Sequence, residues 1–485
     1  MNADYASLLK MLQPEGCLVV GALAVLTVDL TWGRRRPESR HYAAMLIGLL
    51  ALGLAGLSAV CGGGGGGAFG DAFVIDRLAV AARVGVIGLA ALALALLPVR
   101  LRHPAEFTAI VLFATVGFTL MAAANNLLLV FLAVELASLS LYVLAGFDKT
   151  RPESAEAALK YFLFGGMSAA FLLFGFSLLY GLTSSIQLSV IAHQLALQGP
   201  SPLLLTALGM VIVALGFKAA AAPFHLWAPD VYQGAPAPAA ALIASASKLA
   251  GLVVFTRLLW AGLGTATGAV AHVPVVAGWT PLVALIAGAS LLLGNLGALA
   301  QTNVRRLLAY SAIAHAGALL LGVISAGRLG AGPLVYYAAT YGLATVGAFG
   351  VLSVLEASGP AQQLSDLAGL HRRSPLLAGC LAVFVLSLAG IPPLAGFFGK
   401  FAVFASVLRL NGLAGPVGWL AILAIAMSAV ALYYYLLILK QALVAVPAKE
   451  AAPVRVPPSA AVALLVAAAL LVVLGILPSL VLGLL

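Results

Sequence analysis

The stretch GFKAAAAPFHLWAPD, residues 216–230, places a lysine and two prolines inside an otherwise apolar run. Lys218 is followed five residues later by Pro223, and His225 comes two residues after that. A charged side chain is costly inside an apolar membrane helix, and a proline removes a helix hydrogen bond and clashes with the preceding turn. The stretch therefore predicts a helix that breaks beside a buried lysine.

The composition of the chain is that of a membrane protein. Of the 485 residues, 63% are hydrophobic and 8% are charged, whereas a soluble domain carries about 25% charged residues. Apolar runs of roughly 20 residues recur along the chain, which is the length that spans a bilayer as a helix. Strict alternation of apolar and polar residues is absent, which argues against an outer-membrane barrel. We expect an all-α polytopic membrane protein.

About fourteen transmembrane helices are expected. No polar connection between them is long enough to form a soluble nucleotide-binding, flavin-binding or catalytic domain, so any chemistry belongs inside the helical bundle. The three cysteines are isolated and indicate neither a disulfide framework nor a metal site. The expected helices lie near residues 15–32, 42–60, 77–97, 105–123, 125–146, 155–180, 201–228, 236–262, 275–296, 303–325, 332–356, 375–408, 414–440 and 458–483.

The net charge of +10 is divided unevenly between the two sides of the membrane. By the positive-inside rule the side rich in lysine and arginine faces the cytoplasm, which places both termini on the periplasmic side of a bacterial inner membrane. The basic excess therefore indicates topology and not binding to nucleic acid. The cytoplasmic set is Arg34, Arg35, Arg36, Arg40, Arg100, Arg102, Lys149, Arg151, Arg305, Arg306, Arg372, Arg373, Lys449 and Arg455, and the opposite set is Lys10, Arg77, Arg328 and Arg409.

A second stretch, AGIPPLAGFFGKF (389–401), repeats the combination of a helix break and a lysine. Pro392 and Pro393 interrupt the twelfth expected helix, and Lys400 follows them. The seventh and twelfth helices are five helices apart, so they enter the membrane from opposite sides. This layout predicts two inverted five-helix repeats. It divides the chain into helices 1–3 (1–104), helices 4–8 (105–262), helices 9–13 (263–445) and helix 14 (446–485).

Four charged residues are expected near the middle of the bilayer. Glu135 lies about ten residues inside its helix, which is roughly 15 Å at 1.5 Å per residue, in a bilayer core about 30 Å thick. Lys248 lies at similar depth, and Lys218 and Lys400 lie beside the two breaks. Residues of this kind usually face the interior of a bundle or water, and they usually carry function.

Other charged side chains lie closer to helix ends. Lys160 is about one turn inside the sixth expected helix, where a lysine either takes part in the same function or extends its ammonium to the membrane interface. The interface alternative is also open for Arg257 and Lys440.

The charged residues at mid-depth suit proton transfer. Burial disfavours the charged form of a lysine and a nearby carboxylate favours it, so a changing distance between Glu135 and Lys218 would move a proton on or off. Arginine would stay protonated throughout. At each proline break, some backbone groups lose their helix hydrogen bonds and must bond to protein or water instead. The breaks therefore predict hydrated pockets beside the lysines. His225 and His315 are either proton relays between these sites or hydrogen-bonded packing residues.

Four stretches in combination carry a family resemblance: GFKAAAAPFHLWAPDVYQGAPAP, SASKLAG, RRLLAYSAIAHAG and AGIPPLAGFFGKF. Together they resemble the antiporter-like membrane subunits of respiratory complex I, which are related to subunits of multisubunit sodium/proton antiporters. The resemblance implies fourteen transmembrane helices, two inverted repeats and broken helices seven and twelve. It also implies that the family's charged positions in helices five, six, seven, eight and twelve match Glu135, Lys160, Lys218, Lys248 and Lys400.

The resemblance further implies a path for protons. Glu135 modulates Lys218, which exchanges a proton with Lys248 through bound water, and Lys248 communicates with Lys400 through the region of His315. Within the family, the chain stops just after helix fourteen, without the long lateral C-terminal helix of subunit L. Lys400 stands where subunit M typically carries a glutamate.

The resemblance implies that this chain binds no cofactor, because the NADH, quinone, FMN and iron–sulfur clusters of the complex belong to other subunits. The implied partners are the antiporter-like subunit M, the small subunit K, membrane lipid, protons and water. Two alternatives remain open from the sequence. One is a subunit of a multisubunit sodium/proton antiporter, and the other is a membrane scaffold whose charges only hold subunits together.

Overall fold

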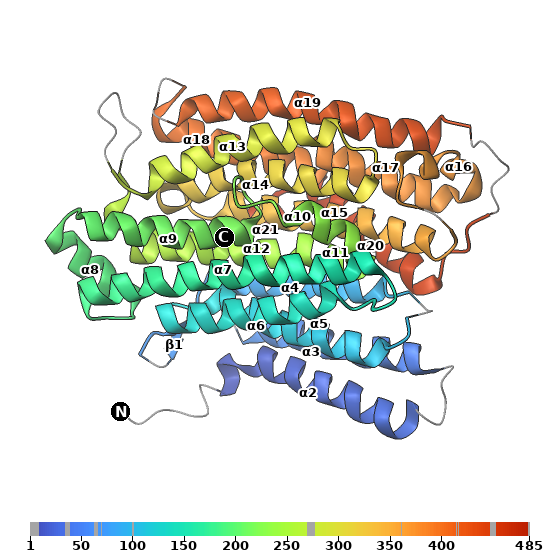
Figure 1. Cartoon of the computed structure of the whole chain (residues 1–485), viewed down its shortest axis with the longest axis horizontal. Coiled ribbons are helices and arrows are strands. Elements are labelled where there is room, and N and C mark those ends of the chain that lie inside the picture. Colours follow the sequence, from blue (N-terminus) through green and yellow to red (C-terminus); the bar gives the residue numbers. More distant parts are fainter. Residues whose placement is uncertain are drawn as a thin grey trace.

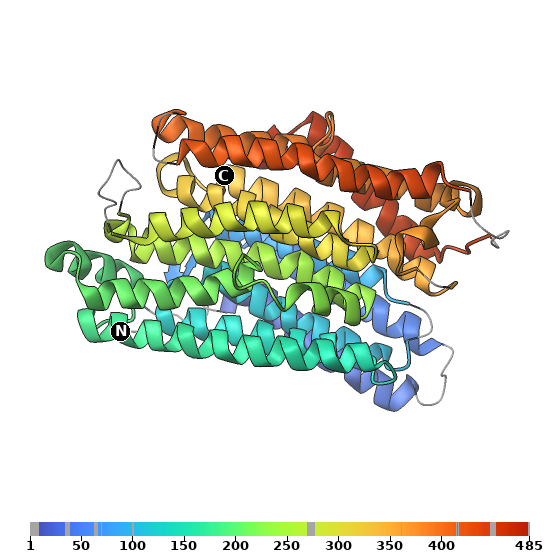
Figure 2. The same cartoon turned by 45° about the horizontal axis from the view of Figure 1, so that its top comes forward.

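The structure is a computed structural model, and most of its described residues belong to long helices that lie along one direction (Figures 1 and 2). Both chain termini lie outside the described residues. So do five residues of the expected cytoplasmic set: Arg34, Arg35, Arg36, Arg100 and Lys449. The structure describes residues 9–33, 39–62, 66–68, 70–98, 101–268, 277–359, 361–413, 415, 417–446 and 453–483.

Thirteen helical segments of the described residues are long and apolar enough to cross a membrane. They are α2 (Gln13–Val28) with the π-helical turn η1 (Asp29–Gly33), α3 (Arg40–Cys61), α4 (Arg77–Ala95), α5 (Pro104–Ala123), α6 (Leu127–Ala145), α7 (Pro152–Thr183), α9 (Pro202–Ala219), α11 (Ala237–Ala244) with α12 (Ala246–Arg257) and η3 (Leu258–Gly262), α13 (Trp279–Leu299), α14 (Val304–Leu329), α15 (Gly332–Glu356), α19 (Gly418–Leu443) and α20 (Pro458–Ile476).

The twelfth expected helix is present as two shorter ones, α17 (Pro375–Ala389) and α18 (Ala395–Asn411). With this pair, each of the fourteen expected segments corresponds to helix in the structure, which confirms the all-α polytopic fold. Smaller elements connect the long helices: α8 (Leu188–Gln198), α10 (Ala228–Gly234), η4 (Gly264–Ala266), η5 (Leu364–Leu367) and α16 (Leu370–Arg373). The short α21 (Ser479–Leu482) follows α20. A small hairpin pairs β1 (Gly66–Ala68) with antiparallel β2 (Phe73–Ile75).

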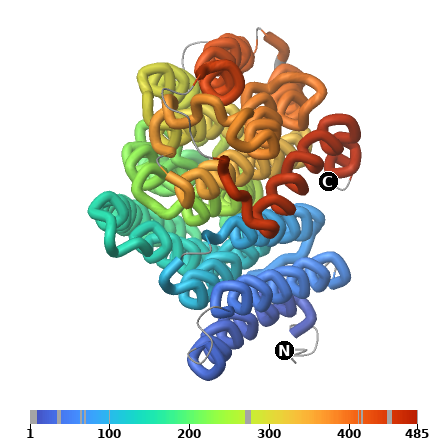
Figure 3. The backbone as a smooth tube through the Cα atoms, turned by 90° about the vertical axis from the view of Figure 1, so that its right-hand side faces the viewer, coloured from blue at the N-terminus to red at the C-terminus, as the bar shows by residue number. Residues whose placement is uncertain are grey.

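The helices differ in how deeply they are buried. The α11–α12–η3 span, which carries Lys248, is buried along its whole length, and α14, which carries His315, and α15 are nearly so, whereas α2, α7 and α19 are the least buried of the long apolar helices in the described part of the chain. The end-on view in Figure 3 shows this packing of central and peripheral helices. In hydrocarbon, exposed apolar side chains cost nothing, so close packing and internal hydrogen bonds hold the central helices together.

Both expected breaks are present and share one backbone pattern. At the end of α9, the N–H groups of Ala220 and Ala221 donate back to Phe217 and Gly216, and Ala220 has a left-handed conformation with φ 56°. Turns then continue to α10. The peptide bond Ala222–Pro223 is cis.

At the end of α17, Gly390 and Ile391 donate in the same way to Ser387 and Leu386, and Gly390 has φ 86°. The peptide bond between the two prolines that follow is also cis. In both breaks the returning hydrogen bonds satisfy carbonyl groups that the end of a helix leaves free.

A third interruption was not predicted. The segment 236–262 was expected as one continuous helix, but Ser245 separates α11 from α12 with φ −115° and ψ −82°. No proline or glycine marks this point in the sequence. The interruption places Lys248 in the first turn of α12, close to free backbone groups.

The connecting segments gather at two ends of the bundle, with α8 and β1 at one end and α16 at the other (Figure 1). At the α16 end, backbone hydrogen bonds join Val304 to Gln362 and Val454 to Arg373. At the opposite end, Asn125 and Gln187 donate their side-chain amides to backbone carbonyls of the β1–β2 connection. The loops are therefore grouped as the sequence predicted. Which end faces the cytoplasm remains a prediction.

Neighbouring glycines on α7 provide a test of this packing. A Cβ at Gly165 would overlap the hydroxyl of Tyr142, whereas a Cβ at Gly166 would have nothing within 4 Å. Alanine favours helix over glycine by about 1 kcal/mol, and overpacking costs about 1–3 kcal/mol. We expect Gly165→Ala to lower the unfolding midpoint of the purified protein and Gly166→Ala to maintain or raise it. Equal midpoints for the two variants would contradict the packing of α6 against α7.

Candidate functional site

Lys218 lies at the end of α9, one residue before the last residue of the helix, and its ammonium donates to the hydroxyl of Ser138 on α6 at 3.1 Å. Glu135 lies one turn earlier on α6, and both Glu135 and Lys218 line one small cavity. Among the described residues, no carboxylate oxygen lies within 4.0 Å of the Lys218 ammonium. The lysine is therefore buried against a neutral acceptor, with the carboxylate across a cavity.

Lys218 also lies close to the helix that carries the next lysine. A Cβ placed on Gly251 of α12 would lie 2.9 Å from Lys218 Cγ, so this glycine makes room for the lysine side chain. Gly251 is one turn beyond Lys248 on the same helix. The side chain of the first buried lysine therefore packs against the helix of the second.

Lys248 is 2% exposed, and its ammonium makes one hydrogen bond and one cation–π contact among the described residues. Its ammonium donates to the backbone carbonyl of Ala312 on α14 at 2.6 Å. It also lies 5.2 Å from the centre of the Tyr341 ring on α15. A lysine over an aromatic face is attracted to the negative charge of the ring, more strongly where water is excluded. Both contacts favour the protonated form of Lys248.

His315 lies one turn beyond Ala312 on α14, at the centre of a cluster of tyrosines. Its Nδ1 is 2.7 Å from the Tyr337 hydroxyl and its Nε2 is 3.1 Å from the Tyr435 hydroxyl. Its ring also packs against Tyr341 with 4.8 Å between centroids. The same tyrosine ring therefore contacts both Lys248 and His315.

Lys400 lies on α18, the second half of the other broken helix, and not on the half that precedes the break. Its ammonium donates to the carbonyl of Ala389, the last residue of α17, at 3.0 Å. Lys400, His315 and Tyr337 line a second cavity. The break thus supplies a free carbonyl for the lysine, and the cavity joins the lysine to the histidine.

These contacts bring five of the seven predicted site residues into one connected series. Glu135 and Lys218 share a cavity, Lys218 packs on the helix of Lys248, and Lys248 contacts the helix of His315. His315 then shares a cavity with Lys400. The middle of the series, Lys248 and His315, lies on two of the most buried helices of the bundle, α12 and α14.

Lys160 lies apart from this series. Its ammonium is 2.6 Å from both Glu156 and Asp230, and Asp230 also pairs with Arg306 at 2.6 Å. Burial alone would raise the pKa of Asp230, but hydrogen bonds from Lys160 and Arg306 outweigh this and keep that pKa below its ordinary value. Lys160 is one of the half-exposed members of an ion-pair network.

His225 also lies apart from the series. It is half-buried in the turn between α9 and α10 and lines neither cavity. Its Nδ1 has no hydrogen-bond partner among the described residues. The neighbouring Pro223 and Leu226 are exposed, so this turn lies at the surface of the chain.

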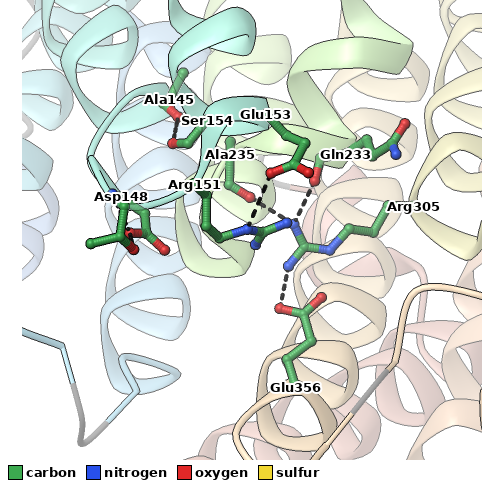
Figure 4. Close-up of polar contacts among 10 residues, drawn as sticks. Ala145, Asp148, Arg151, Glu153, Ser154, Gln233, Ala235, Arg305 and Glu356 are labelled. Carbon is green, nitrogen blue, oxygen red and sulfur yellow. Dashed lines mark hydrogen bonds and ion pairs between the residues drawn. The ribbon is translucent and has the colours of Figure 1, made fainter.

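Arg305 is a buried arginine that links α10, the short helix after the break at the end of α9, to α14 and α15 (Figure 4). Arg305, at the start of α14, donates to the backbone carbonyls of Gln233 at 3.1 Å and Ala235 at 2.6 Å, and it pairs with Glu356 at the end of α15. It thus satisfies carbonyls at the end of α10 while its own charge is paired. The hydrogen bonds of Arg305 fix the position of α10 against α14, although the segment before α10 is irregular.

Several residues of the site were not identified from the sequence. Ser138, Tyr341, Tyr337 and Tyr435 lie on helices far apart in the chain, and only the fold brings them to the lysines and the histidine. Among the described residues, no three His, Cys, Asp or Glu side chains cluster in a way that could hold a metal ion.

The fold and this site define an integral membrane protein of the class with broken helices and a buried row of ionisable side chains. Residues 124–432 match the family described as NADH:quinone oxidoreductase/Mrp antiporter, TM. The chain belongs to this family of membrane subunits. It is 48% identical to NADH-quinone oxidoreductase subunit N 2 of Acidobacterium capsulatum, over 99% of this chain and 98% of the relative.

Solved structures agree with this assignment. A chain of respiratory complex I from Thermus thermophilus is 38% identical, with a TM-score of 0.81 over 97% of this chain and 98% of that one. A chain of the Mrp complex from Dietzia sp. has the same TM-score at 20% identity, over 98% of this chain and 96% of that one. At 20% identity, the likeness to the Mrp complex chain shows a shared fold and nothing more.

The two cavities are expected to hold water. They leave about 10 Å³ beside Lys218 and about 20 Å³ beside Lys400 for the centres of water molecules, and one buried water needs about 10–15 Å³ and polar partners. We expect ordered water within hydrogen-bonding distance of Lys218 and of Lys400 in an experimental map that resolves water. Lys218→Met should lose the first water and keep the second. Two dry cavities in such a map would contradict the hydrated site.

Proposed function

We propose that this chain is a proton-translocating membrane subunit of a respiratory NADH-quinone oxidoreductase, in the position of subunit N. The identity of 48% over nearly the full length to a relative of that name supports this proposal, as does the 38% identity to a chain of respiratory complex I. The chain contributes to a translocase without holding a redox centre. NADH, FMN, iron–sulfur clusters and quinone act in other subunits of the complex.

The observation that carries the proposal is the buried series of lysines with neutral hydrogen-bond acceptors. Lys218, Lys248 and Lys400 are each less than 10% exposed, and each donates to a hydroxyl or a backbone carbonyl. A buried ammonium without a paired carboxylate has a charged form that is only weakly favoured over the neutral one. Such a lysine can release and regain a proton with small changes in its surroundings.

The proposed transfer follows the contacts of the site. A shift of Glu135 toward Lys218 favours the protonated lysine, and a shift away releases the proton to water in the shared cavity. Lys248 takes up a proton through water near Gly251, where the two lysine helices touch. The tyrosine cluster around His315 then connects Lys248 to the cavity of Lys400, which opens toward the outer side. Quinone reduction elsewhere in the complex would shift Glu135 and start the cycle.

The proposed topology places the arginine-rich α16 end in the cytoplasm and both termini in the periplasm. In this orientation the chain lies in a bacterial inner membrane, between antiporter-like subunit M and small subunit K. We further propose that residues 105–262 and 263–445 are inverted repeats, flanked by residues 1–104 and 446–485. The matching hydrogen-bond pattern at the two breaks supports this division.

Single lysine substitutions test the proposal in the assembled complex. We expect Lys218→Ala and Lys248→Ala each to lower proton pumping and the coupled NADH–quinone activity on the order of a hundredfold, because general acid–base groups contribute about that much. Lys440→Ala is the matched control, since Lys440 is an exposed lysine at the end of α19. The measurements are proton uptake and NADH oxidation in inverted membrane vesicles, with assembly checked on native gels.

The outcomes separate the alternatives. Normal pumping by Lys218→Ala and Lys248→Ala would refute the proposal. Loss of the assembled complex in both variants, with no effect of Lys440→Ala, would support a scaffold. Sodium-dependent growth rescue without a defect in NADH oxidation would support a sodium/proton antiporter.

A second test concerns Tyr341, which contacts both Lys248 and His315. Tyr341→Leu removes the ring, and the lost cation–π attraction of about 0.5–2 kcal/mol corresponds to a decrease in pumping of roughly 2- to 30-fold. Tyr341→Phe keeps the ring, and the hydroxyl has no hydrogen-bond partner among the described residues. We therefore expect Tyr341→Phe to pump normally. A loss in Tyr341→Phe equal to that in Tyr341→Leu would show that the hydroxyl, and not the ring, matters.

A further inference from the structure

An apolar groove opens on the surface of the bundle between α4 and α20, with α15 at its base. Its volume is about 670 Å³. Figure 3 shows α20, in dark red, beside the blue helices of the N-terminal part. Gly88 adds depth to the groove, because a Cβ there would have nothing within 4 Å. The groove is lined by residues that include Val84, Gly88, Leu92, Leu343, Val466 and Leu470.

A more polar pocket of about 340 Å³ continues the groove at the α16 end of the bundle. It is lined by the segment after α4, the end of α15 and the segment before α20, including Ser358 and Arg455. Among the described residues that line this pocket, Arg455 alone is charged; it is exposed and forms no ion pair with any described residue. The apolar groove therefore ends in a cationic pocket at the depth where helices leave the membrane.

The length of the groove restricts what can fill it. Along α20 the lining residues run from Pro458 to Leu470, a rise of twelve residues or about 18 Å of helix. Half of a bilayer core is about 15 Å, whereas a helix that crosses the membrane needs about 30 Å. The groove is thus one leaflet deep, which matches an acyl chain from the α16 side and not a spanning partner helix.

We propose that the groove holds one anionic phospholipid of the leaflet at the arginine-rich end, with its phosphate at Arg455 and an acyl chain between α4 and α20. Apolar contact alone does not select a lipid, because the bilayer offers the same surroundings. The selectivity comes from the arginine, since basic pockets on the cytoplasmic side bind anionic headgroups. This site lies apart from the lysine series and does not depend on the proposed proton transfer.

Photolabelling tests the site in the full complex. The complex is reconstituted into nanodiscs that contain a phosphatidylglycerol with a photoreactive acyl chain, and labelled peptides are mapped by mass spectrometry. We expect labels on residues 84–95 and 458–470. Val466→Trp fills the groove and should remove these labels, whereas Leu465→Trp places the same side chain on the neighbouring exposed position, which does not line the groove.

The headgroup contact has its own pair of variants. Arg455→Gln should lower the labelling about fivefold, as expected for the loss of one basic residue near anionic lipid, and Arg372→Gln, an exposed arginine at the same end, should leave it unchanged. Labelling of the two peptides that persists in both Val466→Trp and Arg455→Gln would overturn the proposal. Labels on a neighbouring subunit's helix in their place would show that a protein fills the groove. Because Arg455→Gln is a surface change, it tests the site even if Val466→Trp fails to assemble.

Discussion

The constraint on which this structure depends is that each buried ammonium needs hydrogen-bond acceptors where no bulk water is present. Lys218 obtains a serine hydroxyl, Lys248 a helix carbonyl, and Lys400 a carbonyl freed by a break. Gly251 makes room for the Lys218 side chain, Lys248 lies in the first turn after an interruption, and the proline break before Lys400 frees the carbonyl that this lysine uses. The irregular backbone of the bundle is therefore located where the charges are.

The distribution of ion pairs supports this account. Among the described residues, ion pairs lie mainly at the two ends of the bundle, as with Arg306–Asp230 and Arg257–Asp76. These pairs hold elements together and keep their charges constant, because separating them would leave a charge without a partner. For the three lysines of the series, the described part of the chain places no carboxylate at ion-pair distance. The ends of the bundle are thus suited to rigid assembly, and the centre to a change of protonation.

Sequence reasoning located the helices and both proline breaks, since hydrophobic length and proline act locally along the chain. The structure also buries three of the four charged residues that were expected at mid-depth, Lys218, Lys248 and Lys400. Sequence reasoning did not predict the interruption at Ser245, because no proline or glycine marks that point in the sequence. It also placed Lys160 with the possible proton sites, although that lysine is held by Glu156 and Asp230. Contacts such as Lys218 with Ser138 join residues eighty positions apart, and no spacing in the sequence reveals them.

The central claim is that Lys218 and Lys248 act as consecutive members of one proton path. The most direct test is a double-variant cycle that compares the proton-pumping rates of Lys218→Ala, Lys248→Ala and the combined variant in the reconstituted complex. Groups that act as one unit are strongly non-additive, so the account predicts that the combined variant pumps no more slowly than the slower single variant. Losses that multiply would mean that the two lysines act independently and would contradict a single path.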